Sequence, residues 1–257
     1  IVVDLVGGVK DLLDKLIRTV GNPLDRFGED PLRKLRALRF ASRLGARLDP
    51  EVHAALSKSE FKDYKPEESL GSVSKERIRD EFLKSIEKAK VPSAYLQWLA
   101  DYNYLIFIFP APNGYAHDDD SFINKSWTNS NTPIVQVATL LKNINFTDNP
   151  KYYNQLSTRY AYTVEDVRQI KALFSIMDFD INKIRDVKND IEVSNLKEKD
   201  AIEFAKNNAI DKNLVYALYD FKLSVKGNDP RCEGLSGKPL GDKIKELEAE
   251  AFKKIYK

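Results

Sequence analysis

The stretch Arg26–Phe40, RFGEDPLRKLRALRF, places two carboxylates before a proline and a run of arginines after it. Asp30 followed by Pro31 predicts a helix start, because an aspartate side chain accepts free backbone N–H groups and proline suits the first helical position. Glu29 also suits the positive end of a helix. We therefore expect a helix over Pro31–Leu44, and a start of this kind is common in helices that have only a structural role.

Arginines recur along this predicted helix. At about 100° per residue, a stripe roughly 120° wide holds five of them: Arg33, Arg36, Arg39, Arg43 and Arg47. A solvated face more often mixes lysine, glutamate and glutamine. The stripe therefore indicates an anionic ligand or an RNA backbone as a candidate partner.

Most of the chain after Asp30 has helical periodicity, and turn-rich segments separate the helices. The candidate helices are Pro31–Leu44, Pro50–Ser57, Lys75–Glu87, Ser93–Tyr102, Pro133–Asn143, Thr163–Met177, Val187–Asp190, Leu196–Asn207, Lys212–Lys226 and Leu240–Tyr256. Before them, a β-branched run from Ile1 turns at Gly7-Gly8 and continues at helical spacing to Ile17. The pattern predicts a mainly α fold, an elongated array of helical subdomains preceded by one remnant strand. A lone strand is unstable without partners, which points to a sheet outside this chain.

Composition excludes several classes of protein. The chain has 41 lysines and arginines and 39 acidic residues, so its net charge of +2 does not by itself indicate nucleic-acid binding. No apolar run reaches the roughly 18–20 residues of a membrane span. Cys232 is the one cysteine and there are two histidines, which excludes a disulfide framework and an ordinary zinc site. We expect a cytoplasmic protein without a membrane partner.

Three stretches together resemble a known family in order and spacing. They are DLVGGVKDL from Asp4, IRTVGNPLDRFGEDPLRKLRALRFASRLGARLDP from Ile17 and VSKERIRDEFLKSI from Val73. They are similar to the later motifs of the class II tRNA nucleotidyltransferases and bacterial poly(A) polymerases. In that family a D..GG..D turn joins a catalytic head to a helical neck, an EDxxR motif recognises the incoming nucleotide, and an ERxxxE helix braces it.

The resemblance implies that Asp30 and Arg33 form a protein template for CTP and ATP. Glu29 would position it, and Arg36 would belong to the same nucleotide site. The chemistry agrees, because cytosine and adenine both offer an amino donor beside a ring-nitrogen acceptor, whereas guanine and uracil present the opposite order. A helix cap and the residue three positions later lie over one turn, so both side chains can address one base edge.

The first motif has two interpretations. Asp4, Gly7, Gly8 and Asp11 could form only a strand-to-helix turn. The resemblance makes them the head–neck hinge, where glycine permits backbone rotation.

The ERxxxE motif also has two interpretations. Glu76, Arg77 and Glu81 could lie on an exposed charged helix capped by Ser74. By the resemblance they form an ion-pair network that supports the neck, since a base-reading arginine needs neighbours that hold it.

Basic residues of the distal half are candidate RNA contacts, together with one arginine of the neck. Phosphate or stacking contacts are expected for Arg43, Arg159, Lys171, Lys238 and Lys243. Solvated or structural roles are equally compatible with their spacing. The run HDDD, His117–Asp120, invites a metal assignment, but the chain has too few histidines for the His-Asp phosphohydrolase domain of some relatives, so we assign no metal site.

The resemblance also implies a division of the chain. Residues 1–26 would be the end of the head and its connection, 27–90 the nucleotide-selecting neck, 91–180 the body and 181–257 the tRNA-binding tail. The fold is thus expected to be the neck, body and tail that follow an α/β nucleotidyltransferase head.

The chain has no GG…D.D element of the kind that holds the catalytic metal in this family, so we expect no catalytic residue in it. Mg²⁺ would be held by a head from upstream sequence or a partner chain. The expected function is addition of CCA, from CTP and ATP, to tRNA 3′ ends without a nucleic-acid template, with the acceptor arm and elbow of tRNA as partner. Alternatives are a poly(A) polymerase or CC-adding relative, and a catalytically silent RNA-binding module.

Overall fold

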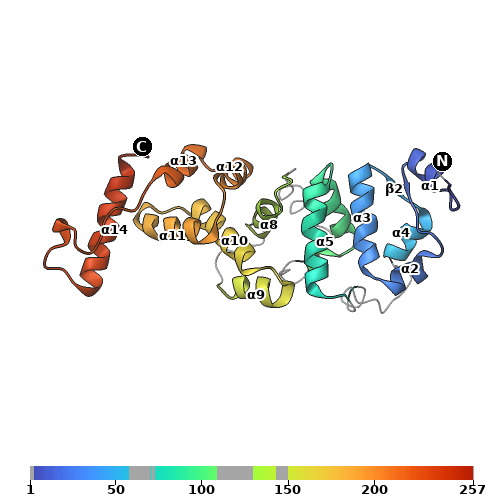
Figure 1. The fold of residues 1–257 in the computed structure, drawn as a ribbon, viewed down its shortest axis with the longest axis horizontal. Helices are drawn as coiled ribbons and strands as arrows, with labels where there is room; N and C mark the ends of the chain where they lie inside the picture. The colour runs from blue at the N-terminus through green and yellow to red at the C-terminus, as the bar shows by residue number, and fades with distance from the viewer. Residues whose placement is uncertain (1–2, 58–69, 71–72, 109–129, 143–149, 257) are drawn as a thin grey trace.

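The computed structural model describes residues 3–57, 70, 73–108, 130–142 and 150–256. They form an elongated row of helices, with the two ends of the chain at opposite ends of the long axis (Figure 1). The expectation of a mainly α fold is confirmed. One hydrophobic core runs through the row from Phe27 to Phe252, and a smaller cluster of Val225, Cys232 and Leu247 lies towards the C-terminus.

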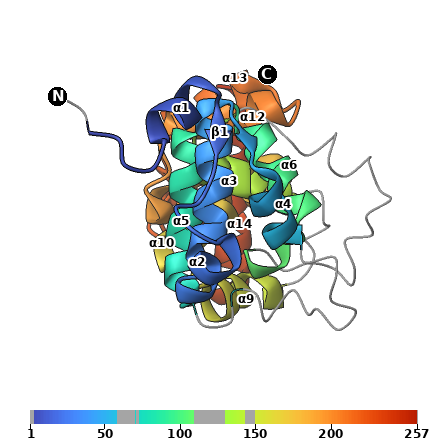
Figure 2. The same cartoon turned by 90° about the vertical axis from the view of Figure 1, so that its right-hand side faces the viewer.

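The N-terminal half is built around one long helix. Its elements are α1 (Gly8–Leu13), β1 (Leu16–Ile17), α2 (Pro23–Glu29), α3 (Leu32–Leu44), β2 (Arg47–Leu48), α4 (Pro50–Ser57), α5 (Lys75–Lys88), α6 (Pro92–Asp101) and the 3₁₀ turn η2 (Leu105–Phe107). Leu35, Leu38 and Ala41 bury one face of α3, and this face packs against α5 and α6. Seen from the N-terminal end, α3 runs down the middle, with α1 near one of its ends and α2 near the other (Figure 2).

The distal half is a series of shorter helices. They are α8 (Pro133–Lys142), α9 (Pro150–Tyr160), α10 (Val164–Met177), η4 (Ile181–Lys183), α11 (Ile184–Ser194), α12 (Glu198–Asn207), α13 (Lys212–Asp220), η5 (Pro230–Cys232) and α14 (Gly237–Lys253). α10 packs against α8 and α11, and α11 packs against α14. Each helix therefore buries its apolar stripe against its neighbours along the row.

The start of the chain differs from the sequence-based expectation. Val3–Val6 are not a strand, and no described strand pairs with them. The Asp4 carboxylate instead accepts the backbone N–H groups of Gly8 and Val9, each at 2.9 Å, at the start of α1. An extended segment without a paired neighbour leaves its backbone groups unsatisfied, so the local cap takes its place.

The expectation that helical structure continues to Ile17 is also wrong, because α1 ends at Leu13. Lys15 has a positive φ of 50°, which ends the helical turn. β1 then pairs in parallel with β2, with Leu16 opposite Arg47 and Ile17 opposite Leu48. Arg47 therefore lies on a strand and does not extend the arginine stripe of α3.

Three further helices differ from the sequence-based expectation. α2 was not expected; Asn22 caps it by accepting Leu24 N at 2.8 Å, and Pro23 occupies its first turn. α11 is longer than the helix Val187–Asp190 that the sequence predicts. α13 stops at Asp220, because the next residues are extended and Glu248 of α14 accepts the backbone N–H groups of Ser224 and Val225.

Helix α5 joins the two halves. On one side, its Glu81 accepts a hydrogen bond from Arg39 of α3 at 2.6 Å, and both side chains are at least nine-tenths buried. On the other side, Lys75 Nζ donates to Thr158 O at 3.3 Å and Arg79 donates to Ala161 O, which places both cations at the C-terminal end of α9. Cations near a helix C-terminus are favourable, so α5 links α3 to the distal helices by polar contacts as well as packing.

We expect Arg39→Met to lower the free energy of unfolding by about 3 kcal/mol, because it leaves the Glu81 carboxylate buried without its closest cation. The double variant Arg39→Met/Glu81→Met should recover most of the loss, since an apolar pair needs no partner charge. Chemical denaturation measures both. Arg168→Met, at an exposed arginine of α10 that has no ion pair with any described residue, is the matched control; an equal loss there would contradict the prediction.

Candidate functional site

The candidate site forms where α2 ends and α3 begins. Glu29 is the last residue of α2, and Asp30 is extended, with φ −146° and ψ 97°. The Asp30 Oδ1 atom accepts the backbone N–H of Leu32 at 3.2 Å, and the Asp30 carbonyl accepts that of Arg33 at 3.0 Å. The expected Asp30 cap is therefore confirmed, and it holds two acidic side chains next to the first turn of α3.

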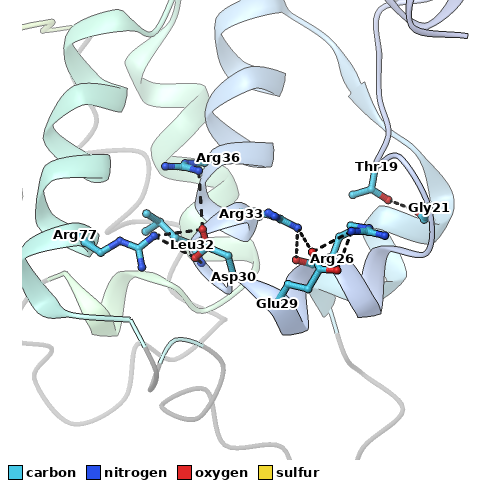
Figure 3. Close-up of polar contacts among 9 residues, drawn as sticks. All are labelled: Thr19, Gly21, Arg26, Glu29, Asp30, Leu32, Arg33, Arg36 and Arg77. Atoms are coloured by element: carbon cyan, nitrogen blue, oxygen red, sulfur yellow. Dashed lines mark hydrogen bonds and ion pairs between the residues drawn. The ribbon is translucent and has the colours of Figure 1, made fainter. Parts of the chain in front are cut away.

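The Asp30 carboxylate also faces α5. Arg77 Nη2 donates to its two oxygens at 3.3 and 3.2 Å, and Arg36 Nη1 lies 3.9 Å from Oδ2 (Figure 3). The sequence placed Arg77 in a bracing helix without indicating which group it contacts. In the structure it contacts the carboxylate that we expect to read the base, and so fixes its direction from a second helix.

Arg33 has a different set of partners. Its Nη1 atom donates to Glu29 Oε2 at 2.6 Å and to the backbone carbonyl of Arg26 at 3.1 Å (Figure 3). Within the part of the chain that the structure describes, its Nε and Nη2 atoms make no hydrogen bond. The guanidinium is therefore held through one nitrogen, and the N–H groups of the other two are open to a ligand.

Asp30 and Arg33 are thus close in sequence but are not paired with each other. Asp30 Oδ2 has one hydrogen-bond donor, Arg77, and a carboxylate oxygen can accept a second bond. Arg33 has N–H donors on Nε and Nη2 that make no hydrogen bond within the described residues. An acceptor and at least one donor therefore remain available at the start of the same helix, which is the combination that a cytosine or adenine edge requires.

Glu29 is bonded by two arginines. Arg26 Nη1 donates to Oε1 at 2.7 Å and to Oε2 at 3.0 Å, while Arg33 takes Oε2. The hydrogen bond from Arg33 and the charge of Arg26 hold the pKa of the Glu29 carboxyl below its ordinary value, although partial desolvation opposes them. Sequence reasoning missed Arg26, but its spacing of three from Glu29 is a signal that could have found it.

The arginine stripe is not an open cationic face. Arg39 is 8% exposed and bonded to Glu81, and Arg36 Nε lies 3.7 Å from the same carboxylate. Arg47 is on β2, and Arg43 is exposed and has no ion pair with a described residue. The expectation of one continuous stripe is wrong because α5 supplies a carboxylate that neutralises its middle.

Ser74 and Glu76, at the start of α5, interact with groups of the same helix start. Ser74 caps the helix, as expected, by accepting Arg77 N at 3.4 Å. The backbone N–H of Glu76 and the Ser74 hydroxyl, close to the Glu76 carboxyl, keep the pKa of that carboxyl below its ordinary value. Glu76 has no ion pair with α2 or α3 in the described part of the chain.

The four candidate hinge residues form one small unit around α1. Asp4 caps this helix, and its bonds from Val9 and Gly8 lower the pKa of its carboxyl. Gly7 has φ 76°, a left-handed conformation that glycine adopts without strain. Asp11 pairs with Arg18 at 3.1 Å, just after β1. The unit therefore ties α1 to the strand that follows it.

The face around α1 is apolar and exposed. No residue of α1 is buried, and a hollow of about 390 Å³ lies between α1, β1 and α3, with Asp11, Arg18 and Phe40 in its lining. Large apolar side chains are more than 40% exposed here: Leu5, Val6, Val9, Leu12, Leu13, Val20, Phe40 and Leu44. So many exposed large apolar side chains around one hollow are typical of a protein–protein contact.

The candidate RNA contacts do not form one site. Arg159 lies over the ring of Tyr160 in α9, and Lys171 of α10 pairs with Asp190 at 2.8 Å. Lys238 is exposed in α14, where Lys243 pairs with Glu246 at 3.0 Å. α9 and α14 lie at different positions along the row (Figure 1). The residues His117–Asp120 lie outside the described part of the chain.

The described residues offer neither a metal-binding cluster nor a membrane-spanning helix. They contain no group of three or more His, Cys, Asp or Glu side chains that could hold a metal ion. None of their helices is both long and apolar enough to span a membrane.

The chain has relatives among well-described proteins, although no family model matches it. It is 48% identical to the CCA-adding enzyme of Bacillus subtilis over 86 residues, which are 34% of this chain and 20% of that enzyme. It is 36% identical to poly(A) polymerase I of Escherichia coli O157:H7 over 112 residues, which are 44% of this chain and 22% of the polymerase. The match thus spans about a fifth of these relatives, and the family resemblance seen in the motifs is confirmed.

Solved structures share the fold over nearly the whole chain. The Thermotoga maritima CCA-adding enzyme in complex with tRNA matches 97% of this chain and 63% of its own, with a TM-score of 0.61 and 18% identity. The Bacillus stearothermophilus CCA-adding enzyme in complex with CTP matches 98% and 64%, with a TM-score of 0.62 and 17% identity. At this identity the likeness concerns the fold alone.

Glu29→Gln should lower stability by a small amount, because the pair of arginines loses its carboxylate at an exposed position. A carboxyl whose folded-state pKa is lowered stabilises the fold above its ordinary value of 4.5, and this contribution is lost as the pH falls through the lower folded-state pKa. The difference between wild type and variant should therefore be constant near neutral pH and shrink below about pH 4.5, as measured by denaturation at several pH values. Glu233→Gln, at an exposed glutamate, is the control, and a difference that persists unchanged into strong acid would contradict the assignment.

Proposed function

We propose that this chain, a relative of CCA-adding enzymes and bacterial poly(A) polymerases, chooses the nucleotide and binds the RNA in CCA addition. The reaction adds nucleotides from CTP and ATP to tRNA 3′ ends without a nucleic-acid template. The observation that carries the proposal is the start of α3, where Asp30 and Arg33 are each held by other residues and still have one acceptor and free donors. The 48% identity with a CCA-adding enzyme supports it.

In this proposal Asp30 accepts the exocyclic amino group of cytosine or adenine, and Arg33 donates to the neighbouring ring nitrogen. Uracil and guanine would put a carbonyl oxygen against the Asp30 carboxylate and an N–H against the Arg33 guanidinium. Each mismatch leaves desolvated polar groups without a partner, which is an efficient way to reject a ligand. Selection therefore needs no RNA template strand.

The neighbours of the pair have supporting roles. Glu29 positions Arg33, and Arg36 belongs to the same nucleotide site, between Asp30 and Glu81. From α5, Arg77 bonds Asp30 at the start of α3 and Glu81 bonds Arg39 in the middle of that helix. Because these contacts come from a second helix, the pair is preorganised before a nucleotide arrives.

The nucleotidyl-transfer step itself is assigned to a catalytic head and not to the described residues. In this family Mg²⁺ would activate the RNA 3′-hydroxyl and stabilise the leaving pyrophosphate. The described residues do not offer a carboxylate cluster for it, so no step is routed through them. We propose that a catalytic head, from upstream sequence or a partner chain, holds the metal.

The apolar face around α1 is the proposed contact for that head. Its large exposed side chains and the neighbouring hollow need a covering surface, and α1 has no buried residue of its own. Asp4, Gly7, Gly8 and Asp11 then lie between the head and the neck, where we propose that they act as the hinge.

The distal helices are proposed to bind the acceptor arm and elbow of tRNA. Candidate phosphate contacts are Arg43, Arg159, Lys171, Lys238 and Lys243, which lie along the row rather than in one pocket. The elongated arrangement suits an extended RNA surface, and we propose a cytoplasmic enzyme without a membrane partner.

Poly(A) addition is the second candidate reaction. It is favoured by the match to poly(A) polymerase I, which covers more of this chain than the match to the B. subtilis enzyme. Sequencing the 3′ ends made on a truncated tRNA distinguishes the two, since CCA addition stops at a defined end and polyadenylation does not. A preparation that binds RNA but transfers no nucleotide when the head is present would instead indicate a silent RNA-binding module.

Asp30→Asn and Arg33→Ala, made in the protein with its head, should each reduce discrimination between CTP and UTP by roughly 10- to 100-fold. The reason is that each removes one half of the acceptor–donor pair. Competition kinetics measure the ratio, and the tRNA dissociation constant should change by less than about twofold, because tRNA binding is assigned to other helices. Arg168→Ala is the control; unchanged discrimination in both site variants would remove the template assignment.

Leu13→Glu should weaken nucleotide transfer, because it places a charge on the apolar face proposed to contact the head. Transfer rates at saturating tRNA, compared with those of Val193→Glu at an equally apolar exposed position of α11, provide the measurement. Equal activity of the two variants would show that the head binds elsewhere.

A further inference from the structure

We infer that Arg26 is a positioning residue that directs the Arg33 guanidinium through Glu29 and thereby sets nucleotide choice. The inference rests on the proposed function, because it assumes that Arg33 reads the base. Neither the motif assignments nor the comparisons give Arg26 a role. Three contacts of Arg26 connect the Gly21 turn to the start of α3 (Figure 3).

The first contact is a shared carboxylate. Arg26 Nη1 donates to Glu29 Oε1 at 2.7 Å and Oε2 at 3.0 Å, and Arg33 Nη1 donates to the same Oε2 at 2.6 Å. Glu29 therefore cannot turn away from Arg26 without also changing its bond to Arg33. Charge-assisted bonds of this length are among the stronger side-chain interactions.

The second contact holds Arg26 itself. Gly21 has φ 90°, and a Cβ added there would lie 3.4 Å from Arg26 Nε, so the guanidinium packs directly on the turn. Thr19 Oγ1 donates to the Gly21 carbonyl at 2.7 Å and shapes this turn. Arg26 Nε is buried and has no hydrogen-bond partner in the described structure. The orientation of Arg26 is therefore set by the turn and by Glu29, at the expense of one unsatisfied donor.

The third contact is direct. The backbone carbonyl of Arg26 accepts Arg33 Nη1 at 3.1 Å, so residue 26 holds Arg33 by its main chain and, through Glu29, by its side chain. Arg33 is partly exposed and would otherwise have several rotamers of similar energy. Reading a base edge requires a donor that is fixed to within about 0.5 Å. Removing the Arg26 side chain should leave the main-chain contact and release the carboxylate, which loosens Arg33 without removing it.

The experiment uses the whole protein, including its catalytic head, with tRNA and each of the four nucleoside triphosphates. Arg26→Met keeps an unbranched side chain at this position and removes the guanidinium that packs on Gly21 and bonds Glu29. We expect the CTP-over-UTP ratio of kcat/KM to fall roughly tenfold, through a higher KM for CTP rather than a lower kcat, as for a misplaced binding group. Arg26→Lys should recover part of the loss, because an ammonium can still pair with Glu29.

A double-mutant cycle tests the route through Glu29. In a Glu29→Gln background, Arg26→Met should cause little further change in the ratio, since its effect is already absent. Arg168→Met is the matched control and should leave the ratio unchanged. The thermal midpoint is followed in parallel, because a merely structural role would lower stability and kcat for every nucleotide alike.

The outcomes separate the inference from the function on which it rests. Loss of discrimination in Arg33→Ala with normal discrimination in Arg26→Met overturns the role of Arg26 alone. Normal discrimination in both overturns the proposed template. A uniform fall in kcat for all four nucleotides in Arg26→Met, or full additivity with Glu29→Gln, also overturns the route from Arg26 through Glu29 to Arg33.

Discussion

The buried ion pair between Arg39 of α3 and Glu81 of α5 is the constraint on which the packing of these two helices depends. Two charges removed from water must stay together, so the separation and rotation of the two helices are fixed where they meet. The same α5 places Arg77 against Asp30 and sends Lys75 and Arg79 to the end of α9. One helix thus positions the candidate nucleotide site and attaches the distal helices that are proposed to hold the RNA.

The charged side chains of the candidate site have structural partners and still have hydrogen-bonding capacity for the proposed recognition of a nucleotide. Asp30 caps α3, pairs with Arg77 and still has acceptor capacity, while Arg33 is held through one nitrogen and leaves two others open. Exposed charged side chains are usually mobile, and ordering them on ligand binding would lower affinity. Here the ordering is supplied in advance by Glu29 and Arg77, from either side of the α2–α3 junction. This arrangement suits a protein that must compare small differences between base edges.

Much of the fold and part of the site could be predicted from the sequence. Helical periodicity and the Asp30-Pro31 start located α3, and the motif order indicated Asp30, Arg33 and their family. The arginine stripe was misread, because a helical projection shows which residues share a face but not which other element covers it. Glu81 lies 42 positions after Arg39, so no local spacing could show that it neutralises the stripe. Arg77 and Asp30, 47 positions apart, were related only by the family resemblance and not by a contact.

By itself the sequence determined the local properties of this protein: the helical class, the cap at Asp30, the capped start of α5 at Ser74 and an acceptor and a donor one turn apart. These follow from backbone propensity and from groups within about one helical turn of each other. Only the tertiary structure decided that Val3–Val6 are not a strand, that Arg47 pairs in β2, that Arg39 is buried and that Arg77 bonds the Asp30 carboxylate. The physical reason is that burial and ion pairing depend on which neighbours folding brings together, and the strength of a charge contact depends on the water that those neighbours exclude.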